Sequence, residues 1–321
     1  MFYKKALSLM LSLITVLVLC SCSGDSKNKR TQIAVITKST NSDFWKNVFQ
    51  GVNTAAAEYN VDVTITGPES EEDYVSQIEM IQKAIDNGSD AIVLSAIDYN
   101  RLTKIVDRAV DKGIKVITID SGLNSNKVSS FIGTDNYKAG ELAAQTVINQ
   151  LGTDNDIKIG IVNYDVETDN GYQREQGFRS FLKKFKNAEI VEAINVNSNT
   201  DSATSGAITL LYNHPEINVI VGFNEWLTLG VGYAVKQLGC KDAVYAVGFD
   251  SNTVSIGMLE TGEMDSLIVQ NPFAMGYLGI KSAVKAINGK KIEKSITTDS
   301  DVFTKENMFD TDKQKMLFKF Q

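Results

Sequence analysis

Past Arg30, the chain alternates short apolar runs with longer amphipathic stretches almost without interruption. The apolar runs are rich in β-branched residues, and several are apolar along their whole length, as strands covered on both faces must be. Five runs predict strands over residues 33–37, 61–66, 91–95, 116–120 and 131–135. The pattern then repeats, with strands predicted over residues 158–162, 190–196, 219–223, 244–248 and 266–269. Two similar sets predict an α/β fold with two similar, doubly wound parallel-sheet lobes.

The amphipathic stretches between these runs predict helices. The first has apolar residues at helical spacing: Phe44, Val48, Val52, Ala56 and Tyr59. A second helix is predicted to begin at Ser70, with Asp73 in the capping-box position, and to end at Gly88. The chain has only three prolines, and no Pro-rich or Ser-rich linker separates the two sets. We therefore expect the lobes to be joined by strands that pass between them.

The first 22 residues have the pattern of an export signal. Lys4 and Lys5 precede an apolar run over residues 6–19, which is short for a membrane-spanning helix. A core helix or a lone membrane span at this end is the alternative, and it fits the pattern less well. We expect the mature protein to be extracytoplasmic, at the cell surface or in the periplasm.

The end of this segment resembles a bacterial lipobox. Small Ser21 precedes Cys22, and Leu19 lies three positions before it. Cys20 fits less well, because bulky Leu19 would directly precede it. The resemblance implies a lipoprotein signal peptide and lipobox over residues 1–22, lipidation of Cys22 as an anchor to the cell membrane, and a flexible tether over residues 23–30.

Composition excludes several classes of function. The formal net charge of -7 argues against nucleic acid as a partner, because nucleic acids attract basic surfaces. Beyond the signal the only cysteine is Cys240, so no internal disulfide is expected, and we interpret this residue as a small buried apolar group.

Motifs for catalysis are scarce. The single histidine, His214, precedes a proline at a predicted helix end, where a surface turn is the simplest interpretation. The chain has neither a Gly-x-Ser-x-Gly nucleophile elbow nor metal-ligand spacing. The carboxylates Asp120 and Asp250 leave glycoside hydrolysis as an enzymatic alternative. We expect no enzymatic activity, no metal ion and no cofactor.

Polar residues follow several predicted strands at their carboxyl ends, where parallel sheets bind ligands. They are Asp120, Asn224, Asp250 and Gln270. Carboxylates and amides can form two hydrogen bonds at once, which suits vicinal hydroxyls, although such residues also serve as helix caps and in turns. Phe44 and Trp45 follow the first strand, and we expect one ring to face a cleft, where it can cover the C–H face of a sugar, while the other packs inward.

A set of short segments shares its order and spacing with one family. The segments are Ser42-Asp43-Phe44-Trp45, Val116-Ile117-Thr118-Ile119-Asp120, Gly133-Thr134-Asp135-Asn136, Arg174-Glu175-Gln176-Gly177-Phe178, Phe223-Asn224-Glu225, Val247-Gly248-Phe249-Asp250, and Gln270-Asn271-Pro272 followed by Met275-Gly276-Tyr277. Together they resemble the periplasmic sugar-binding proteins of bacterial ABC importers, in the ribose-type branch with the type I fold. The resemblance extends from about residue 33 to residue 307.

The resemblance implies a site and a domain plan. Phe44 and Trp45 would stack on the sugar beside Ser42, and the four polar residues at the strand ends would bind its hydroxyls. A three-segment hinge would cross at Thr134 and Asp135, at Gln270 and Asn271, and near Thr298. One lobe would contain residues 31–134 and 271–297, and the other residues 135–270 and 298–321.

Two positions depart from the ribose-binding pattern. The arginine that usually follows the residue matched by Asp120 is Ser121 here. A second sugar-binding arginine aligns with Tyr172 or the adjoining Gly171-Tyr172-Gln173 turn, while the nearby Arg174 matches a more structural arginine of the family. Neither Ser121 nor Tyr172 replaces the donors of a guanidinium. Another aldose or a polyol, whose hydroxyls would bind Ser121, Tyr172 and Trp226, is therefore as plausible as ribose. We also expect Asp250→Ala and Trp45→Ala to abolish binding while leaving the empty protein nearly as stable.

The expected mechanism is hinge closure of the two lobes around one small sugar or polyol. The partner is an ABC permease that receives the sugar, or a membrane histidine kinase for which this chain is a sensing subunit. The chain itself is expected to be a monomer.

Overall fold

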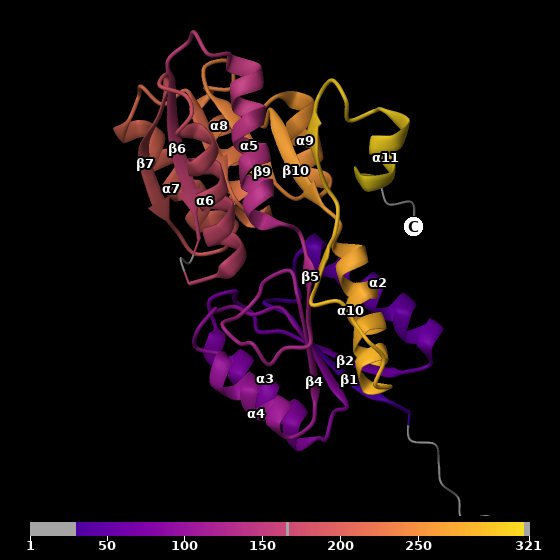
Figure 1. The fold of residues 1–321 in the computed structure, drawn as a ribbon. Coiled ribbons are helices and arrows are strands. Elements are labelled where there is room, and N and C mark those ends of the chain that lie inside the picture. Colours follow the sequence, from indigo (N-terminus) through magenta and orange to yellow (C-terminus); the bar gives the residue numbers. More distant parts are fainter. Residues whose placement is uncertain (1–29, 165–166, 318–321) are drawn as a thin grey trace, which may run out of the picture. The chain divides into compact units, whose positions relative to one another are not determined.

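The computed structural model describes residues 30–164 and 167–317. The chain from Gln32 to Gln321 groups as one compact unit, and the described residues of this unit form two α/β lobes, each built on a six-stranded sheet (Figure 1). The predicted fold class, two similar doubly wound lobes, is confirmed. The predicted signal peptide, Cys22 and most of the tether lie outside the described residues. Within the described part, no helix is both long enough and apolar enough to span a bilayer.

The first lobe has an all-parallel sheet with the strand order β2-β1-β3-β4-β5-β11. Its strands are β1 (Gln32–Ile36), β2 (Asp62–Thr66), β3 (Ala91–Leu94), β4 (Lys115–Ile119), β5 (Ser130–Gly133) and β11 (Ser295–Thr297). Its helices are α2 (Asp43–Tyr59), α3 (Tyr74–Asp86), α4 (Thr103–Asp111) and α10 (Pro272–Ile287). Successive strand residues pack on opposite faces: Val35 lies in the core formed with α2 and α10, and Ile36 in the core formed with α3 and α4.

The second lobe repeats this order as β7-β6-β8-β9-β10, with β12 added antiparallel at the edge. Its strands are β6 (Ile157–Asn163), β7 (Ala188–Asn195), β8 (Val219–Gly222), β9 (Tyr245–Phe249), β10 (Ser266–Gln270) and β12 (Ser300–Thr304). Its helices are α5 (Asn136–Leu151), α6 (Asp169–Leu182), α7 (Thr200–Asn213), α8 (Glu225–Leu238), α9 (Thr253–Thr261) and α11 (Thr311–Leu317). The sequence pattern did not predict β11 or β12, because both are short and mostly polar.

The chain passes from one lobe to the other in three places: between β5 and α5, between β10 and α10, and between β11 and β12. Thr134 and Asp135 lie at the first passage, Gln270 and Asn271 at the second, and Thr298 at the third. Thr134 Oγ1 donates a hydrogen bond to Gln270 Oε1 over 2.9 Å, so the first two passages touch. That these segments bend stays a prediction.

Two sequence predictions are wrong in detail: the start of α3 and the full burial of Cys240. Asp73 does not occupy the third helical position of a helix beginning at Ser70. It is itself the N-cap of α3, and its carboxylate accepts a hydrogen bond from the backbone N–H of Ser76 over 2.9 Å. The helix therefore begins at Tyr74, and a short loop precedes it. Cys240 is only partly buried.

Glycines bring helices into backbone contact in both lobes. A Cβ on Gly177 of α6 would lie 1.9 Å from the carbonyl oxygen of Tyr137 in α5, and one on Gly140 of α5 would lie 1.9 Å from that of Arg174. Likewise, a Cβ on Gly276 of α10 would lie 2.1 Å from the carbonyl oxygen of Val48 in α2, which lies beside it (Figure 1). Only glycine permits these approaches, and the one between α5 and α6 fixes the helix that carries Arg174.

Candidate functional site

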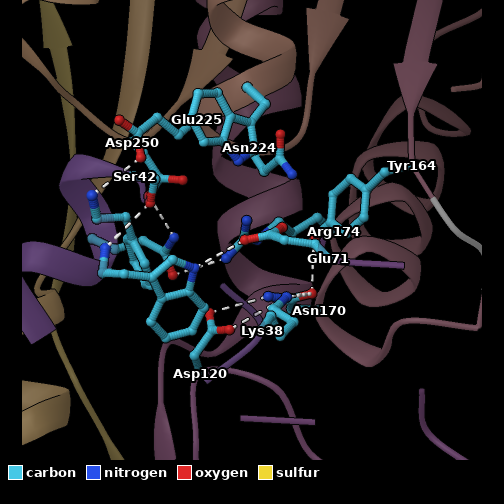
Figure 2. Close-up of a pocket in the computed structure, with 14 residues that line it drawn as sticks. Lys38, Ser42, Glu71, Asp120, Tyr164, Asn170, Arg174, Asn224, Glu225 and Asp250 are labelled. Carbon is cyan, nitrogen blue, oxygen red and sulfur yellow. Dashed lines mark hydrogen bonds and ion pairs between the residues drawn. The ribbon is translucent and has the colours of Figure 1, made fainter. Parts of the chain in front are cut away.

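A cavity lies between the two lobes, at the carboxyl ends of the strands of both sheets. The space among its lining residues, part of it open to solvent, is about 310 Å³, whereas the cavity volume open to water-sized molecules is only about 30 Å³. The residues that line it, drawn in Figure 2, are Lys38, Ser42, Phe44, Trp45, Glu71, Asp120, Tyr164, Asn170, Arg174, Asn224, Glu225, Trp226, Asp250 and Gln270.

The structure brings eight of the ten predicted ligand-binding residues to this cavity: Ser42, Phe44, Trp45, Asp120, Asn224, Trp226, Asp250 and Gln270. Ser42 and Asn224 are also the N-caps of α2 and α8, where their side chains accept hydrogen bonds from the backbone N–H groups of Trp45 and Leu227. The structural and the ligand-binding interpretations of these two residues are therefore compatible, because a capping side chain at a strand-to-helix turn still borders the cavity.

Ser121 and Tyr172 are not among the residues that line the cavity, so its geometry does not favour their predicted contacts with ligand hydroxyls, which stay a prediction. Tyr172 is 55 % exposed. It lies on α6 midway between Asn170 and Arg174, about 200° around the helix from each, and only those two neighbours face the cavity. Ser121 is completely buried, and its hydroxyl has no hydrogen-bond partner among the described residues.

The backbone at Asp120 and Asp250 is unusual. These carboxylates follow β4 and β9, the strands in fourth place in the two equivalent sheet orders. Both residues have left-handed backbone torsions, with φ of 58° and 69°. Such torsions are uncommon outside glycine, are tolerated best by Asp and Asn, and concentrate at functional sites. The two lobes therefore present their carboxylates in the same way.

Both predicted aromatic residues border the cavity, which differs from the expectation that one would pack inward. Their rings meet edge to face, with centroids 5.0 Å apart. Phe44 is 8 % exposed and Trp45 1 % exposed, and both also belong to the core beneath α2. Trp226 borders the cavity from α8 and is half-buried.

Sequence reasoning missed six lining residues: Lys38, Glu71, Tyr164, Asn170, Arg174 and Glu225. Lys38 and Tyr164 follow β1 and β6 closely, so the rule that found the other strand-end residues could have found them. Glu225 directly follows Asn224 in one of the shared segments. Asn170 and Glu71 come from a helix start and a loop whose positions only the folded chain reveals.

Asn170 is the centre of a hydrogen-bond network that joins the lobes (Figure 2). Its Oδ1 accepts from Tyr164 Oη over 2.8 Å and from Lys38 Nζ over 3.3 Å, while its Nδ2 donates to Asp120 Oδ1 over 3.1 Å. Lys38 Nζ also lies 3.4 Å from Asp120 Oδ2. Burial is the largest single influence on Lys38 and would lower its pKa, but the electrostatic effects of Asp120, Tyr164 and Glu71 together outweigh it and raise the pKa, so this lysine stays charged.

Arg174, matched in sequence to a structural arginine, has all three of its guanidinium nitrogens engaged. Nε donates to Asn136 Oδ1 over 2.9 Å, Nη1 to the carbonyl oxygen of Phe223 over 2.6 Å, and Nη2 to Gln270 Oε1 over 2.8 Å. Gln270 in turn donates through Nε2 to Asp250 Oδ1 over 2.6 Å. Arg174 therefore fixes the side chain of Gln270 at the passage between β10 and α10.

Two further carboxyl groups lack a direct cationic partner among the described residues. Burial raises the pKa of Asp250 to about 7, against the opposing charge of Arg174. Burial also raises the pKa of Glu225, which accepts hydrogen bonds from Asn252 Nδ2 over 2.7 Å and from the backbone N–H of Phe44 over 3.1 Å. The cavity is thus rich in hydrogen-bond acceptors and carries no excess of positive charge.

Other candidate chemistry lies away from this cavity. His214 is the C-cap of α7, where it pairs with Glu192 and Glu216 over 2.9 and 3.2 Å. Across residues 30–164 and 167–317, no three His, Cys, Asp or Glu side chains are arranged to hold a metal ion.

Comparison with known proteins gives consistent matches. The family model described as a periplasmic binding protein domain matches residues 33–291. The ribose import binding protein of Bacillus subtilis is 24 % identical over 303 residues, which cover 92 % of this chain and 97 % of that protein. A carbohydrate transporter solute-binding protein from Agrobacterium radiobacter, solved with D-arabinose, has a TM-score of 0.86 and 29 % identity, over 90 % of this chain and 99 % of that one.

A second solved structure, an ABC transporter solute-binding protein from Agrobacterium vitis with bound D-fucose, also has a TM-score of 0.86, with 30 % identity over 89 % of this chain and all of that one. The family model covers most of the chain, and the relatives match along nearly their whole length. The chain therefore belongs to the periplasmic binding protein family.

Proposed function

We propose that this chain binds one small neutral sugar or polyol in the cavity between its lobes and presents it to an ABC permease. The observation that supports this most directly is the convergence of Asp120 from one sheet, and of Asp250 and Gln270 from the other, on a cavity that aromatic rings also border. Carboxylate and amide groups bind hydroxyls, and rings cover the C–H faces between them.

Closure of the lobes would exclude water and so increase the contribution of these hydrogen bonds to binding. A sugar offers little apolar area, and its hydroxyls gain little from exchanging water for protein unless water is excluded. The hinge would act at Thr134, Asp135, Gln270 and Asn271, and the contact between Thr134 and Gln270 supports a coupled movement of two passages.

Ligand identity follows from the donors and acceptors at the cavity. The basic groups Lys38 and Arg174 already bind protein atoms, whereas within the described residues only Oδ1 of the Asp250 carboxylate accepts a hydrogen bond. The ligand would therefore supply mainly donors, which neutral hydroxyls do. The names of the relatives make D-arabinose, D-fucose and ribose the first candidates.

Titration of the purified body with pentoses, hexoses and polyols tests the proposal. Both tryptophans of the chain border the cavity, so we expect a bound sugar to change intrinsic fluorescence and to raise the thermal midpoint. Asp250→Asn is the control that should lose the response. A full panel that changes neither signal would contradict the proposal.

Localisation and delivery need separate experiments. We propose that Cys22 carries the lipid anchor, so Cys22→Ser should shift the protein from the membrane fraction to the soluble extracytoplasmic fraction. Deletion of the gene should reduce uptake of the bound sugar. Normal uptake with lost sugar-dependent gene induction would reject transport and favour the sensing role with a histidine kinase.

A further inference from the structure

Glu71 is a cavity residue that neither the family resemblance nor the strand-end rule selects. It lies in the loop between β2 and α3 of the first lobe and is half-buried. One oxygen of its carboxylate contacts residues of the first lobe, and the other contacts a residue of the second lobe. No ion pair joins Glu71 to a cation elsewhere in the described ranges, so neutral donors carry its hydrogen bonds.

One oxygen holds the indole of Trp45. Trp45 Nε1 donates to Glu71 Oε1 over 2.9 Å, and Ser39 Oγ donates to the same oxygen over 3.3 Å. An indole has a single N–H donor, so this bond fixes which way the ring turns within its pocket. Because the acceptor is charged, the bond is stronger than one to a neutral group.

The other oxygen reaches the second lobe. Ser198, in the loop between β7 and α7, donates through Oγ to Glu71 Oε2 over 3.0 Å. The same Oγ accepts from Asn224 Nδ2 over 2.7 Å, and the backbone N–H of Ser198 donates to the neighbouring Glu72. A continuous chain of hydrogen bonds therefore runs from Asn224 through Ser198 and Glu71 to Trp45.

The geometry points to Glu71 as a positioning residue that couples the orientation of the Trp45 ring to contact between the lobes. When the lobes separate, the hydrogen bond from Ser198 to Glu71 breaks, and Glu71 keeps only its contacts within the first lobe. When they meet, the Ser198 hydroxyl fixes the carboxylate that fixes the ring, while the same hydroxyl orients Asn224. This inference rests on the proposed function, because it concerns the ring expected to stack on the ligand.

Binding kinetics test the part that crosses between lobes. Ser198→Ala removes the hydroxyl bonds to Glu71 and Asn224 and leaves the bond between Glu71 and Trp45. With D-arabinose, D-fucose and D-ribose as probes, we expect dissociation about tenfold faster and association nearly unchanged, as loss of one charge-assisted hydrogen bond implies. Glu71→Ala should have the larger effect and Glu71→Gln a smaller one, because glutamine retains an acceptor for the indole. Glu69→Gln, an exposed change in the same loop, is the matched control.

A second readout does not depend on a sugar. The chain has two tryptophans, so its NMR spectrum has two indole N–H signals, and Glu71→Gln should move the Trp45 signal while the Trp226 signal stays in place. An unmoved Trp45 signal, or unchanged dissociation in Ser198→Ala, would overturn the inference. Absence of binding to any probe in the unmodified protein would instead contradict the proposed function, and the NMR result would still decide whether Glu71 orients the ring.

Discussion

Asn170 Nδ2 donates a hydrogen bond to Asp120 Oδ1 over 3.1 Å, and the two residues belong to different lobes. Asp120 follows β4 of the first sheet, and Asn170 lies in the first turn of α6, the helix that follows β6 of the second sheet. The bond lies at the wall of the cavity, so it links lobe contact directly to a residue proposed to bind hydroxyls.

We predict that Asn170→Ala weakens sugar binding about tenfold, because Asp120 and Lys38 lose a shared partner and one net hydrogen bond is removed. Isothermal titration measures the change. Tyr172→Ala, two residues along the same helix but exposed, is the control and should bind normally. A loss of binding in the tyrosine variant equal to that in the asparagine variant would contradict the assignment of α6 residues to the cavity.

The structure changes the expected result of Trp45→Ala. Trp45 is only 1 % exposed and packs in the core beneath α2, so truncation should lower the free energy of unfolding by about 3–5 kcal/mol. Trp45→Phe keeps most of the ring volume and removes the N–H that bonds Glu71. We expect it to weaken binding with a smaller loss of stability, as measured by titration and by chemical denaturation of the same sample.

Asp250→Ala is likewise a poor test of ligand binding alone, because alanine tolerates the positive φ of this position badly. Asp250→Asn avoids this strain. It should abolish the sugar response while preserving the fold, as circular dichroism would show. Unchanged affinity in this variant would remove Asp250 from the proposed site.

Stability should depend on pH through Asp250. Its pKa is about 7 in the folded protein against 3.8 in the unfolded chain, so between these values the folded state binds a proton that the unfolded state releases. The contribution of this group to the free energy of unfolding is fully present below pH 4 and is lost as pH rises through about 7. Asp250→Asn should therefore match the unmodified protein at low pH and become relatively more stable toward pH 8. A constant difference in thermal midpoint across this range would contradict the raised pKa.

Gly177→Ala should destabilise the second lobe by several kcal/mol, because the added Cβ would lie 1.9 Å from a backbone oxygen of α5. Gly257 of α9 is the matched control, since a Cβ there meets nothing within 4 Å. Gly257→Ala should be neutral or stabilising by about 0.5–1 kcal/mol, as helix propensity predicts. Denaturant midpoints of the two variants test the contrast, and equal midpoints would mean that α5 and α6 can separate freely.

The sequence by itself determined the layered fold. Runs such as the one around Val35 are apolar at every position because alternate side chains enter cores on opposite faces of a covered sheet, and that local pattern is visible without a structure. The ends of those strands were visible too, so Asp120 and Asp250 could be predicted to lie near a common cavity.

Tertiary structure decided which other side chains reach that cavity. Asn170 and Tyr172 are nearly adjacent in sequence, yet the direction of α6 brings one to Asp120 and leaves the other exposed. Glu71 and Ser198 are distant in the chain and meet only because loops from two lobes come together. Local periodicity carries no information about such pairings, because helix orientation and loop contact are set by packing between elements.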